Sequence, residues 1–222
     1  MEQLIRTKLT RRQLQKLSIA LPAPLALAAI GFRTPGIAFA QTDDATETVE
    51  AEATAALAPT PACLDDDDLE TTLEQTEGPF YTTDTPERTS FLEPGITGTT
   101  LVVSGYVYST GCEPIAGAFL DFWHCDDTGA YDNVGYKLRG HQFADADGRF
   151  ELETIVPAVY SGRTRHIHVK VQAPDQPELT TQLYWPDEPE NDSDGIFDPA
   201  LVMDVEETDD GQRGFFNFVL AV

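Results

Sequence analysis

The chain has 222 residues, and its 14 lysines and arginines stand against 38 aspartates and glutamates, a formal net charge of −24 at pH 7. This charge argues against nucleic acids and anionic membrane surfaces as partners, because both need basic patches. Hydrophobic residues make up 41% of the chain, enough for a sizeable core, so wholesale disorder is excluded. No uninterrupted apolar run reaches the roughly 20 residues of a spanning helix, so no stable membrane insertion is expected.

The first 40 residues have the pattern of an export signal. Arg11 and Arg12 precede an apolar stretch at about 17–32, and residues 38–40 form an Ala-Phe-Ala cleavage pattern. The paired arginines resemble the twin-arginine signal, whose route exports proteins already folded and so suits a protein that first collects a metal. The alternative is an amphipathic anchor helix, which the prolines in the stretch fit poorly. We expect a periplasmic or extracellular protein.

Residues 41–72 are rich in Ala, Thr, Asp and Glu and almost lack aromatic and β-branched apolar residues. They are therefore predicted to be a flexible acidic linker, and the acid run at 65–68 a solvated tail rather than a calcium site. Removing the signal leaves 8 basic and 37 acidic residues, a formal charge of −29. Such an imbalance suits a high-salt environment, where screening is strong.

From residue 73 to 222 the pattern predicts one compact all-β domain. Short β-branched or aromatic runs alternate with turn residues, and no segment has sustained helical periodicity. We therefore expect an antiparallel β-sandwich with long active-site loops. The expected strands span residues 100–109, 118–125, 149–155, 166–173, 179–185 and 214–221, and the turns span 110–111, 126–129, 145–148 and 174–175.

The three cysteines fit an oxidising compartment. Cys63 lies in the linker, Cys112 in a turn and Cys125 at the end of an expected strand. Two of them can pair, which leaves one over. Cys112 and Cys125 should lie at opposite ends of one turn–strand unit, too far apart to bond, so we favour a bridge between Cys63 and Cys112.

The tripeptide His166-Ile167-His168 is the first candidate for chemistry. It lies in an expected strand, where residues i and i+2 point to the same face, so both imidazoles can reach one metal ion. Such pairs also occur by chance, buried or on a solvated face. Cupins use the same pair, but they place a glutamate about four residues later, where this chain has Gln172, and a further histidine that this chain lacks.

Two tyrosines and an arginine strengthen the metal interpretation. Tyr131 follows a turn after an expected strand, Tyr160 lies six residues before His166, and Arg163 lies three residues before it. Either tyrosine alone would more often be a half-buried aromatic with a satisfied hydroxyl. These three neighbours raise the odds of a metal site at the H-x-H pair, and both interpretations stay open at this point.

At this point the sequence resembles the intradiol ring-cleaving dioxygenases, the family of the catechol and protocatechuate 3,4-dioxygenases, and most of all its small exported members. The resembling segments occur in the family's order and cover nearly all of the compact domain. They are residues 76–81 (Thr-Glu-Gly-Pro-Phe-Tyr), 114–118, 122–125, 126–131, 147–150, 160–168 and 181–184. Each segment is ordinary alone, and together they are strong evidence.

The resemblance implies one ferric iron, Fe(III), held by the phenolates of Tyr131 and Tyr160 and the imidazoles of His166 and His168. Ferric iron is a hard cation, and two phenolates neutralise two of its three charges. Free tyrosine has a pKa near 10, so the metal's field is needed to keep both ionised. The implied reaction cleaves a catechol-type diol with O2 between the hydroxylated carbons, giving a cis,cis-muconate-type diacid, with Tyr160 displaced by the substrate.

Other roles also follow from the resemblance. Arg163 matches the arginine that stabilises the electron-rich ring carbon, and Gln182 matches the glutamine that hydrogen bonds near the iron. Pro79, Phe80 and Tyr81 are expected at the pocket mouth, with Pro79 and Tyr81 contacting the substrate alongside Arg163. The remaining candidates are expected to be structural or to face away from the site: Trp123, His124, His141 and Arg165.

The chain also departs from the family. Arg163-Thr164-Arg165 stands where many members have Arg-Pro-Ala, and the stretch from Tyr160 to His166 is shorter than in the intracellular protocatechuate enzymes. Both departures keep the ligand set, but they mean that the residues of the substrate pocket cannot be carried over from the family. The dimerising helical segment of the catechol 1,2-dioxygenases has no counterpart, so the oligomeric state stays open too.

The main rival is a noncatalytic binding module. Transthyretin-like and carboxypeptidase-regulatory-like sandwiches share the patterns at 114–118 and 147–150 but lack the two-tyrosine, two-histidine set. A calcium loop at 191–195 is a weaker rival, because Glu190 and Leu201 occupy its first and twelfth positions. We interpret that segment as an acidic turn.

Overall fold

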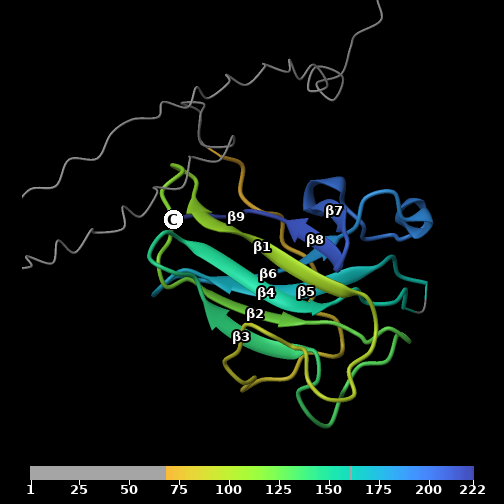
Figure 1. The fold of residues 1–222 in the computed structure, drawn as a ribbon. Coiled ribbons are helices and arrows are strands. Elements are labelled where there is room, and N and C mark those ends of the chain that lie inside the picture. Colours follow the sequence, from red (N-terminus) through yellow and green to blue (C-terminus); the bar gives the residue numbers. More distant parts are fainter. Residues whose placement is uncertain (1–68, 161) are drawn as a thin grey trace, which may run out of the picture. The chain divides into compact units, whose positions relative to one another are not determined.

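The computed structural model describes residues 69–160 and 162–222. The predicted export signal, most of the predicted linker and Cys63 lie outside these residues. In the described part, two β-sheets pack face to face (Figure 1). The five-stranded sheet contains β1 (Thr100–Ser109), β4 (Arg149–Ile155), β7 (Asp204–Thr208), β8 (Gly211–Phe215) and β9 (Phe218–Leu220), and the four-stranded sheet β2 (Phe119–Trp123), β3 (Arg139–Phe143), β5 (His166–Gln172) and β6 (Glu178–Tyr184).

The core lies between the sheets and follows the alternation of the strands. In β1, Leu101, Val103 and Val107 are completely buried, while Val102, Ser104 and Tyr106 on the other face are partly exposed, as a strand with one core face requires. β1 pairs with β4 in antiparallel register from Thr100 opposite Ile155 to Tyr106 opposite Arg149. This pair confirms two expected strands over the ranges predicted from the sequence.

Strand β5 is buried on both faces, and this positions the candidate ligands. Ile167, Val169 and Val171 belong to the core cluster. His166 and His168 therefore project from the opposite, outer face of the four-stranded sheet, together with Trp123, which pairs with His168 in the register. One strand thus contributes to the core and to the candidate site at once.

The prediction of an all-β sandwich is confirmed, but its strand list needs corrections. β3 and β7 were not predicted, because Arg-Gly-His-Gln-Phe and Asp-Val-Glu-Glu-Thr lack apolar alternation. The expected strand at 214–221 is two short strands, β8 and β9, and both run parallel to β1. The break lies beside Gly105, where a Cβ would stand 1.7 Å from the carbonyl oxygen of Phe216.

Helical structure in the described residues is confined to two short 3-10 turns, Pro189–Asp192 and Pro199–Leu201. No helix there is long and apolar enough to cross a membrane. Cys112 is disulfide-bonded and Cys125 is free and buried. Because Cys63 is not described, the Cys63–Cys112 bridge stays a prediction.

The last residues of the predicted linker bond to the sandwich. The amide of Leu69 donates to the carbonyl of Thr110 at 2.8 Å, and the amide of Thr72 donates to that of Val219 in β9 at 2.9 Å. The amide of Val219 returns a bond to the hydroxyl of Thr72 at 2.8 Å. Residues 69–72 therefore add to the domain edge next to β9.

We predict that salt stabilises this domain. Residues 69–222 contain 28 acidic and 8 basic residues, and of the basic ones only Lys137, Arg149 and Arg213 are exposed. The surface is thus almost purely acidic, and its self-repulsion falls as the Debye length shrinks from about 10 Å at 0.1 M to 3 Å at 1 M salt. The melting temperature, followed by circular dichroism, should rise between 0.05 and 1 M KCl by roughly 2–4 °C per kcal/mol gained. A melting temperature indifferent to KCl would contradict this.

Candidate metal centre

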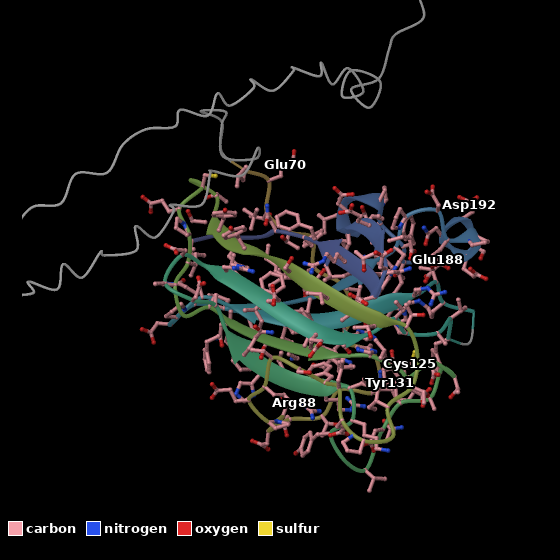
Figure 2. All side chains as sticks on the ribbon, in the orientation of Figure 1. Glu70, Arg88, Cys125, Tyr131, Glu188 and Asp192 are labelled. Atoms are coloured by element: carbon pink, nitrogen blue, oxygen red, sulfur yellow. The ribbon has the colours of Figure 1, made fainter. Side chains whose placement is uncertain are left out.

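Two loops and one strand bring the predicted ligands together. Tyr131 lies in the loop after β2, Tyr160 in the loop between β4 and β5, and His166 and His168 at the start of β5. Figure 2 shows Tyr131 near Cys125, close to the end of β2. The two histidines are buried and the two tyrosines half-buried, so the four side chains meet at the domain surface.

One distance between these side chains is short enough for two donors to share a metal ion, and the rings of the others lie nearby. The hydroxyl oxygen of Tyr131 lies 3.5 Å from Nε2 of His166. The rings of His166 and His168 are 4.8 Å apart, and those of Tyr131 and Tyr160 are 5.6 Å apart, edge to face. Two donors that each bind one ion at about 2 Å lie roughly 3–3.5 Å from each other. The Tyr131–His166 pair meets this spacing.

A backbone carbonyl fixes the tautomer of His166. Its Nδ1 lies 2.6 Å from the carbonyl oxygen of Thr164, which can only accept, so Nδ1 carries the proton. The lone pair of Nε2 is then free and faces Tyr131. Burial lowers the pKa of His166 to about 4, which the Thr164 bond opposes and the Arg163 charge reinforces. His166 is therefore neutral at pH 7, as metal binding requires.

His168 is held by packing. Its ring stacks on Trp123 at 4.8 Å with an interplanar angle of 6°. A Cβ at Gly78 would lie 3.3 Å from its Cε1, so the backbone at Gly78 approaches the ring closely. Among the described residues, Nδ1 of His168 is buried without a hydrogen-bond partner, and burial, followed by the neighbouring His166, lowers its pKa well below the ordinary value. A neutral, buried imidazole fits a ligand position.

The protein alone keeps Tyr131 in its phenol form. Burial and the nearby Cys125 raise the pKa of Tyr131, although Arg163 and Arg139 oppose them. An additional positive charge is needed to ionise it, and a bound metal supplies one. The described residues contain no group of three or more His, Cys, Asp or Glu side chains placed to hold a metal ion. The candidate donors are the predicted pair of phenols and pair of imidazoles, a chemistry that suits a hard trivalent cation.

The two tyrosine-bearing loops are joined to each other. The Asp126 carboxylate accepts from the amides of Thr128 and Ala130, both at 2.9 Å, and so shapes the loop before Tyr131. Its backbone carbonyl accepts from the amide of Ala158 at 3.0 Å, in the loop that leads to Tyr160. Displacing one loop therefore disturbs the other.

A tight turn links Tyr160 to Arg163. The amide of Arg163 donates to the carbonyl of Tyr160 at 2.7 Å, and Gly162 has a φ of 80°. No atom lies within 4 Å of a Cβ placed at Gly162, so glycine serves the backbone conformation rather than space. The turn explains how the short stretch between Tyr160 and His166 can still bring both side chains to the site.

Arg163 belongs to a polar network that also contains Gln182. Its Nε donates to Asp194 at 2.8 Å, and its Nη2 to Oε1 of Gln182 at 2.7 Å. The amide nitrogen of Gln182 donates to the carbonyl of Thr76 at 2.8 Å, which fixes the amide orientation. Gln182 thus orients Arg163 from one side and Asp194 from the other.

The sequence analysis missed Asp194, which it placed in an acidic turn. Its side chain is only 2% exposed and accepts from Arg163 and from the amide of Thr164 at 2.9 Å. Nothing in the sequence separates it from the exposed Asp192 two residues earlier. Only the fold shows which of the two carboxylates is buried.

The predicted pocket-mouth residues lie on the segment 75–85, which covers the outer face of the four-stranded sheet. Phe80 stacks on Tyr131 at 4.4 Å and meets Tyr160 edge-on at 5.5 Å. Pro79 is exposed. Tyr81 lies against Trp123, and its hydroxyl donates to Asp121 at 3.1 Å. Of the three, Phe80 contacts both candidate phenol ligands.

The other residues considered from the sequence lie away from the donor set. Arg165 pairs with Glu188 at 2.9 Å and also donates to the carbonyl of Pro157. His141 is half-buried and lies 3.1 Å from the hydroxyl of Thr85. Trp123 is only 1% exposed, as a core residue would be, yet its ring packs against His168 on the outer face.

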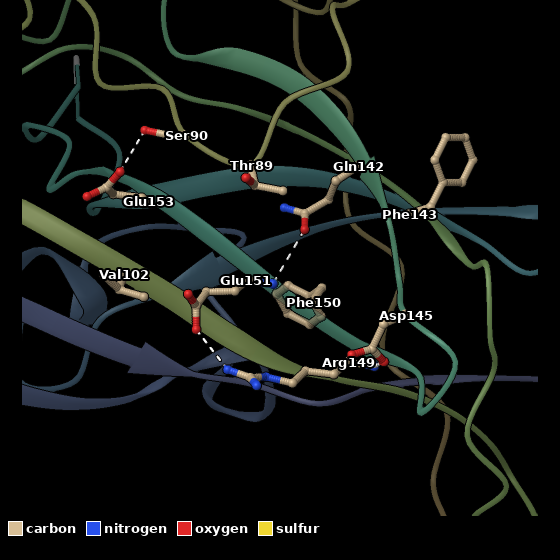
Figure 3. Close-up of a pocket in the computed structure, with 10 residues that line it drawn as sticks. All are labelled: Thr89, Ser90, Val102, Gln142, Phe143, Asp145, Arg149, Phe150, Glu151 and Glu153. Atoms are coloured by element: carbon tan, nitrogen blue, oxygen red, sulfur yellow. Dashed lines mark hydrogen bonds and ion pairs between the residues drawn. The ribbon is translucent and has the colours of Figure 1, made fainter. Parts of the chain in front are cut away.

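The described residues line two cavities of interest, one next to Tyr131 and one beside β3 and β4. One of about 270 Å³ is lined by Asp126, Tyr131 and Asp132, so it adjoins one candidate ligand. The other, of about 540 Å³, lies by β3 and β4, is lined by Gln142, Glu151 and Glu153 among others (Figure 3), and has none of the four candidate ligands in its lining.

His124 confirms the expectation of a structural histidine and gives a pH prediction. It is 1% exposed, and its Nδ1 donates to the carbonyl of Cys125 at 2.7 Å. Burial lowers its pKa to about 4, so folding favours the neutral ring. Its stabilising contribution is complete above pH 6.5 and falls as the pH drops towards 4, by about 2–3 kcal/mol at pH 4.5.

Urea unfolding of the wild type and His124→Gln between pH 7 and 4.5 checks this prediction. The wild type should lose more stability than the variant, by the amount just given, because shifts of the other groups are common to both proteins. Equal losses would contradict it.

The fold and the site together define an all-β protein whose outer sheet face gathers two phenols and two imidazoles. Residues 76–221 match the family model described as dioxygenase (Dioxygenase_C). The chain therefore belongs to the intradiol ring-cleavage dioxygenase family, as the sequence motifs indicate.

Individual relatives agree. The chain is 54% identical to the dioxygenase domain of a dioxygenase carbohydrate-binding protein fusion from Streptomyces sp. SirexAA-E, with a TM-score of 0.68, covering 69% of this chain and 99% of that one. It is 26% identical to 3-chlorocatechol 1,2-dioxygenase from Rhodococcus opacus 1CP, with a TM-score of 0.64 and coverage of 68% and 72%. It is 29% identical to catechol 1,2-dioxygenase from Pseudomonas sp. (strain EST1001), over 54% of this chain and 49% of that protein. The chain spans about half the length of the curated relatives it matches.

Proposed function

We propose that this protein is a ferric non-haem dioxygenase that cleaves a catechol-type ring with O2 between its two hydroxylated carbons, giving a cis,cis-muconate-type diacid. The observation that carries the proposal is the 3.5 Å approach of the Tyr131 hydroxyl to the free Nε2 of His166, with Tyr160 and His168 beside them. Relatives named catechol, hydroxyquinol and chlorocatechol 1,2-dioxygenase support this substrate class.

Iron would be held by Tyr131, Tyr160, His166 and His168. When bound, ferric iron supplies Lewis acidity that activates the diol towards O2 and aligns the two reactants. The two imidazoles are already neutral, as their lowered pKa values indicate, so they need no deprotonation before they bind.

The chain's own residues supply the remaining functions. The Tyr160 oxygen would accept a proton from a substrate hydroxyl. Arg163, next to Tyr160 across the turn, places a fixed positive charge where the ring becomes electron-rich, with its guanidinium held by Asp194 and Gln182. Phe80 packs on both phenol rings and shields them from water.

The test uses the full chain. We expect one iron per chain, a red colour from phenolate-to-iron charge transfer, uptake of one O2 per catechol, and both atoms of ¹⁸O2 in the diacid. Catechol, hydroxyquinol and chlorocatechol would be compared to find the preferred ring. A colourless protein that carries zinc or no metal and consumes no O2 would instead favour the noncatalytic binding module.

We also propose export through the twin-arginine route. The support is the arginine pair at positions 11–12, the short apolar stretch and the Ala-Phe-Ala pattern that ends at residue 40. Fractionation of expressing cells should find a shortened chain outside the cytoplasm, and Arg11→Lys with Arg12→Lys should retain the full-length chain inside. Export unchanged by the double substitution would contradict the route.

A further inference from the structure

Arg139 is a buried cation that the proposed reaction does not use. It begins β3 and is 0% exposed. The described residues contain no ion pair between Arg139 and a carboxylate, although four of the other arginines have one. Burial lowers the pKa of Arg139, and the nearby Asp132 and Asp121 carboxylates oppose this shift without forming an ion pair with the guanidinium. The burial of the Arg139 guanidinium at this position therefore needs a physical explanation.

The contacts of Arg139 surround Tyr131. Its Nε donates to the carbonyl of Asp132 at 2.9 Å, and its Nη1 donates to the carbonyl of Phe80. Asp132 follows Tyr131 in the chain, and Phe80 stacks on the Tyr131 ring. The central carbon of the guanidinium also lies 5.9 Å from the centre of that ring. One side chain therefore fixes both the backbone after Tyr131 and the segment that packs on it.

The carbonyl of Arg139 is itself held. Nε of Arg88 donates to it at 2.9 Å, and Gly140 is so close to Arg88 that a Cβ there would lie 2.8 Å from the Arg88 side chain. Arg88 extends from the segment that runs past β3, so β3 and its neighbour form a rigid support. The guanidinium of Arg139 has a defined position from which to act.

Among the described residues, the support of Tyr160 does not include a buried cation. Its recorded partners are the rings of Phe80 and Tyr131 and the backbone of its own turn, and no described contact joins it to Arg139. The two phenols are therefore held differently. Arg139, a buried cation, bonds to the two backbone carbonyls beside Tyr131, whereas Tyr160 lies on a turn.

We propose that Arg139 is a positioning residue for Tyr131, which locks that phenol as the permanent oxygen ligand while Tyr160 stays free to leave. Arg139 does so by bracing Asp132 and Phe80 on either side of the Tyr131 ring and by placing a positive charge beside it. This inference rests on the proposed iron site.

The test compares the wild type, Arg139→Gln, Arg139→Lys and the surface control Arg213→Gln, each as the full chain stripped of metal. Ferric citrate would be titrated in, with iron binding followed by visible absorption and folding by circular dichroism. Arg139→Gln should bind iron about 10- to 100-fold more weakly and shift the phenolate-to-iron band. Arg139→Lys, which keeps the charge but cannot donate in both directions, should recover part of the affinity. Arg213→Gln should match the wild type.

The outcomes separate this inference from the proposed function. A wild type that binds no iron overturns both. A coloured wild type whose affinity and band are reproduced by folded Arg139→Gln overturns the positioning role alone. If Arg139→Gln does not fold, Arg139→Lys decides, since it keeps the charge but loses the donation to both carbonyls: weaker iron binding with a shifted band supports the proposal, and wild-type affinity with an unchanged band overturns it.

Discussion

Replacing His166 with alanine is expected to abolish iron binding and, with it, O2 uptake. His166 is the proposed ligand whose tautomer the protein fixes in advance, through the 2.6 Å bond from Nδ1 to the carbonyl of Thr164. Losing a ligand should weaken iron binding by more than the roughly 10- to 100-fold typical of an outer partner. Titration of the metal-free protein with ferric citrate, read by visible absorption, measures the loss.

His141→Ala is the matched control, because His141 projects from the same outer sheet face and lies 3.1 Å from the Thr85 hydroxyl rather than near the donor set. It should keep the wild-type colour and affinity. If His166→Ala bound iron as tightly as His141→Ala, with the same absorption, the assignment of His166 as a ligand would be wrong.

The sequence predicted those parts of the fold in which one periodicity dominates. β1 and β4 were predicted over their whole length because apolar and polar residues alternate along them. β3 was missed because its buried residues include Arg139 and Gln142, which no hydropathy pattern places inside. β7 was missed because it is acidic and mostly exposed. Strands formed by pairing rather than by burial leave little trace in a single sequence.

The candidate site divides in the same way. The i, i+2 spacing of His166 and His168 follows from strand geometry, so both could be placed on one face from the residues alone. Tyr131 and Tyr160 sit on loops, and only the family resemblance brought them to the same point. Their approach depends on contacts such as the Asp126 carbonyl with the Ala158 amide, which join segments more than 30 residues apart.

Buried charges were the largest omission. Asp194 and Arg139 are buried and contact residues next to the candidate ligands, and both would be assigned to the surface by residue type. Their burial follows from partners that are distant in sequence: Arg163 for the first, and the carbonyls of Phe80 and Asp132 for the second. Positions of this kind can be read only after the fold is known.

Arg163→Gln is expected to lower kcat by about 10²–10³-fold while leaving iron and its colour in place, because it removes a fixed charge directed at the reacting ring and no metal ligand. Arg165→Gln is a close control. The two arginines lie two residues apart with equal side-chain exposure, 24%, but Arg165 pairs with Glu188 instead. It should stay within about threefold of the wild type, a difference of less than 1 kcal/mol.

Asp194→Asn tests how the position of the Arg163 charge depends on its carboxylate partner. The substitution keeps an acceptor for Arg163 but removes the negative charge that orients it, so kcat should fall by an intermediate amount and KM should change less. Steady-state O2 uptake with catechol, alongside the visible spectrum of each variant, gives both kcat and KM.

If Arg163→Gln and Arg165→Gln lost activity equally, the effect would belong to the loss of a basic residue from a strongly acidic protein rather than to the position of Arg163. If they differed as expected, the network of Asp194, Gln182 and Arg163 would be what directs that charge.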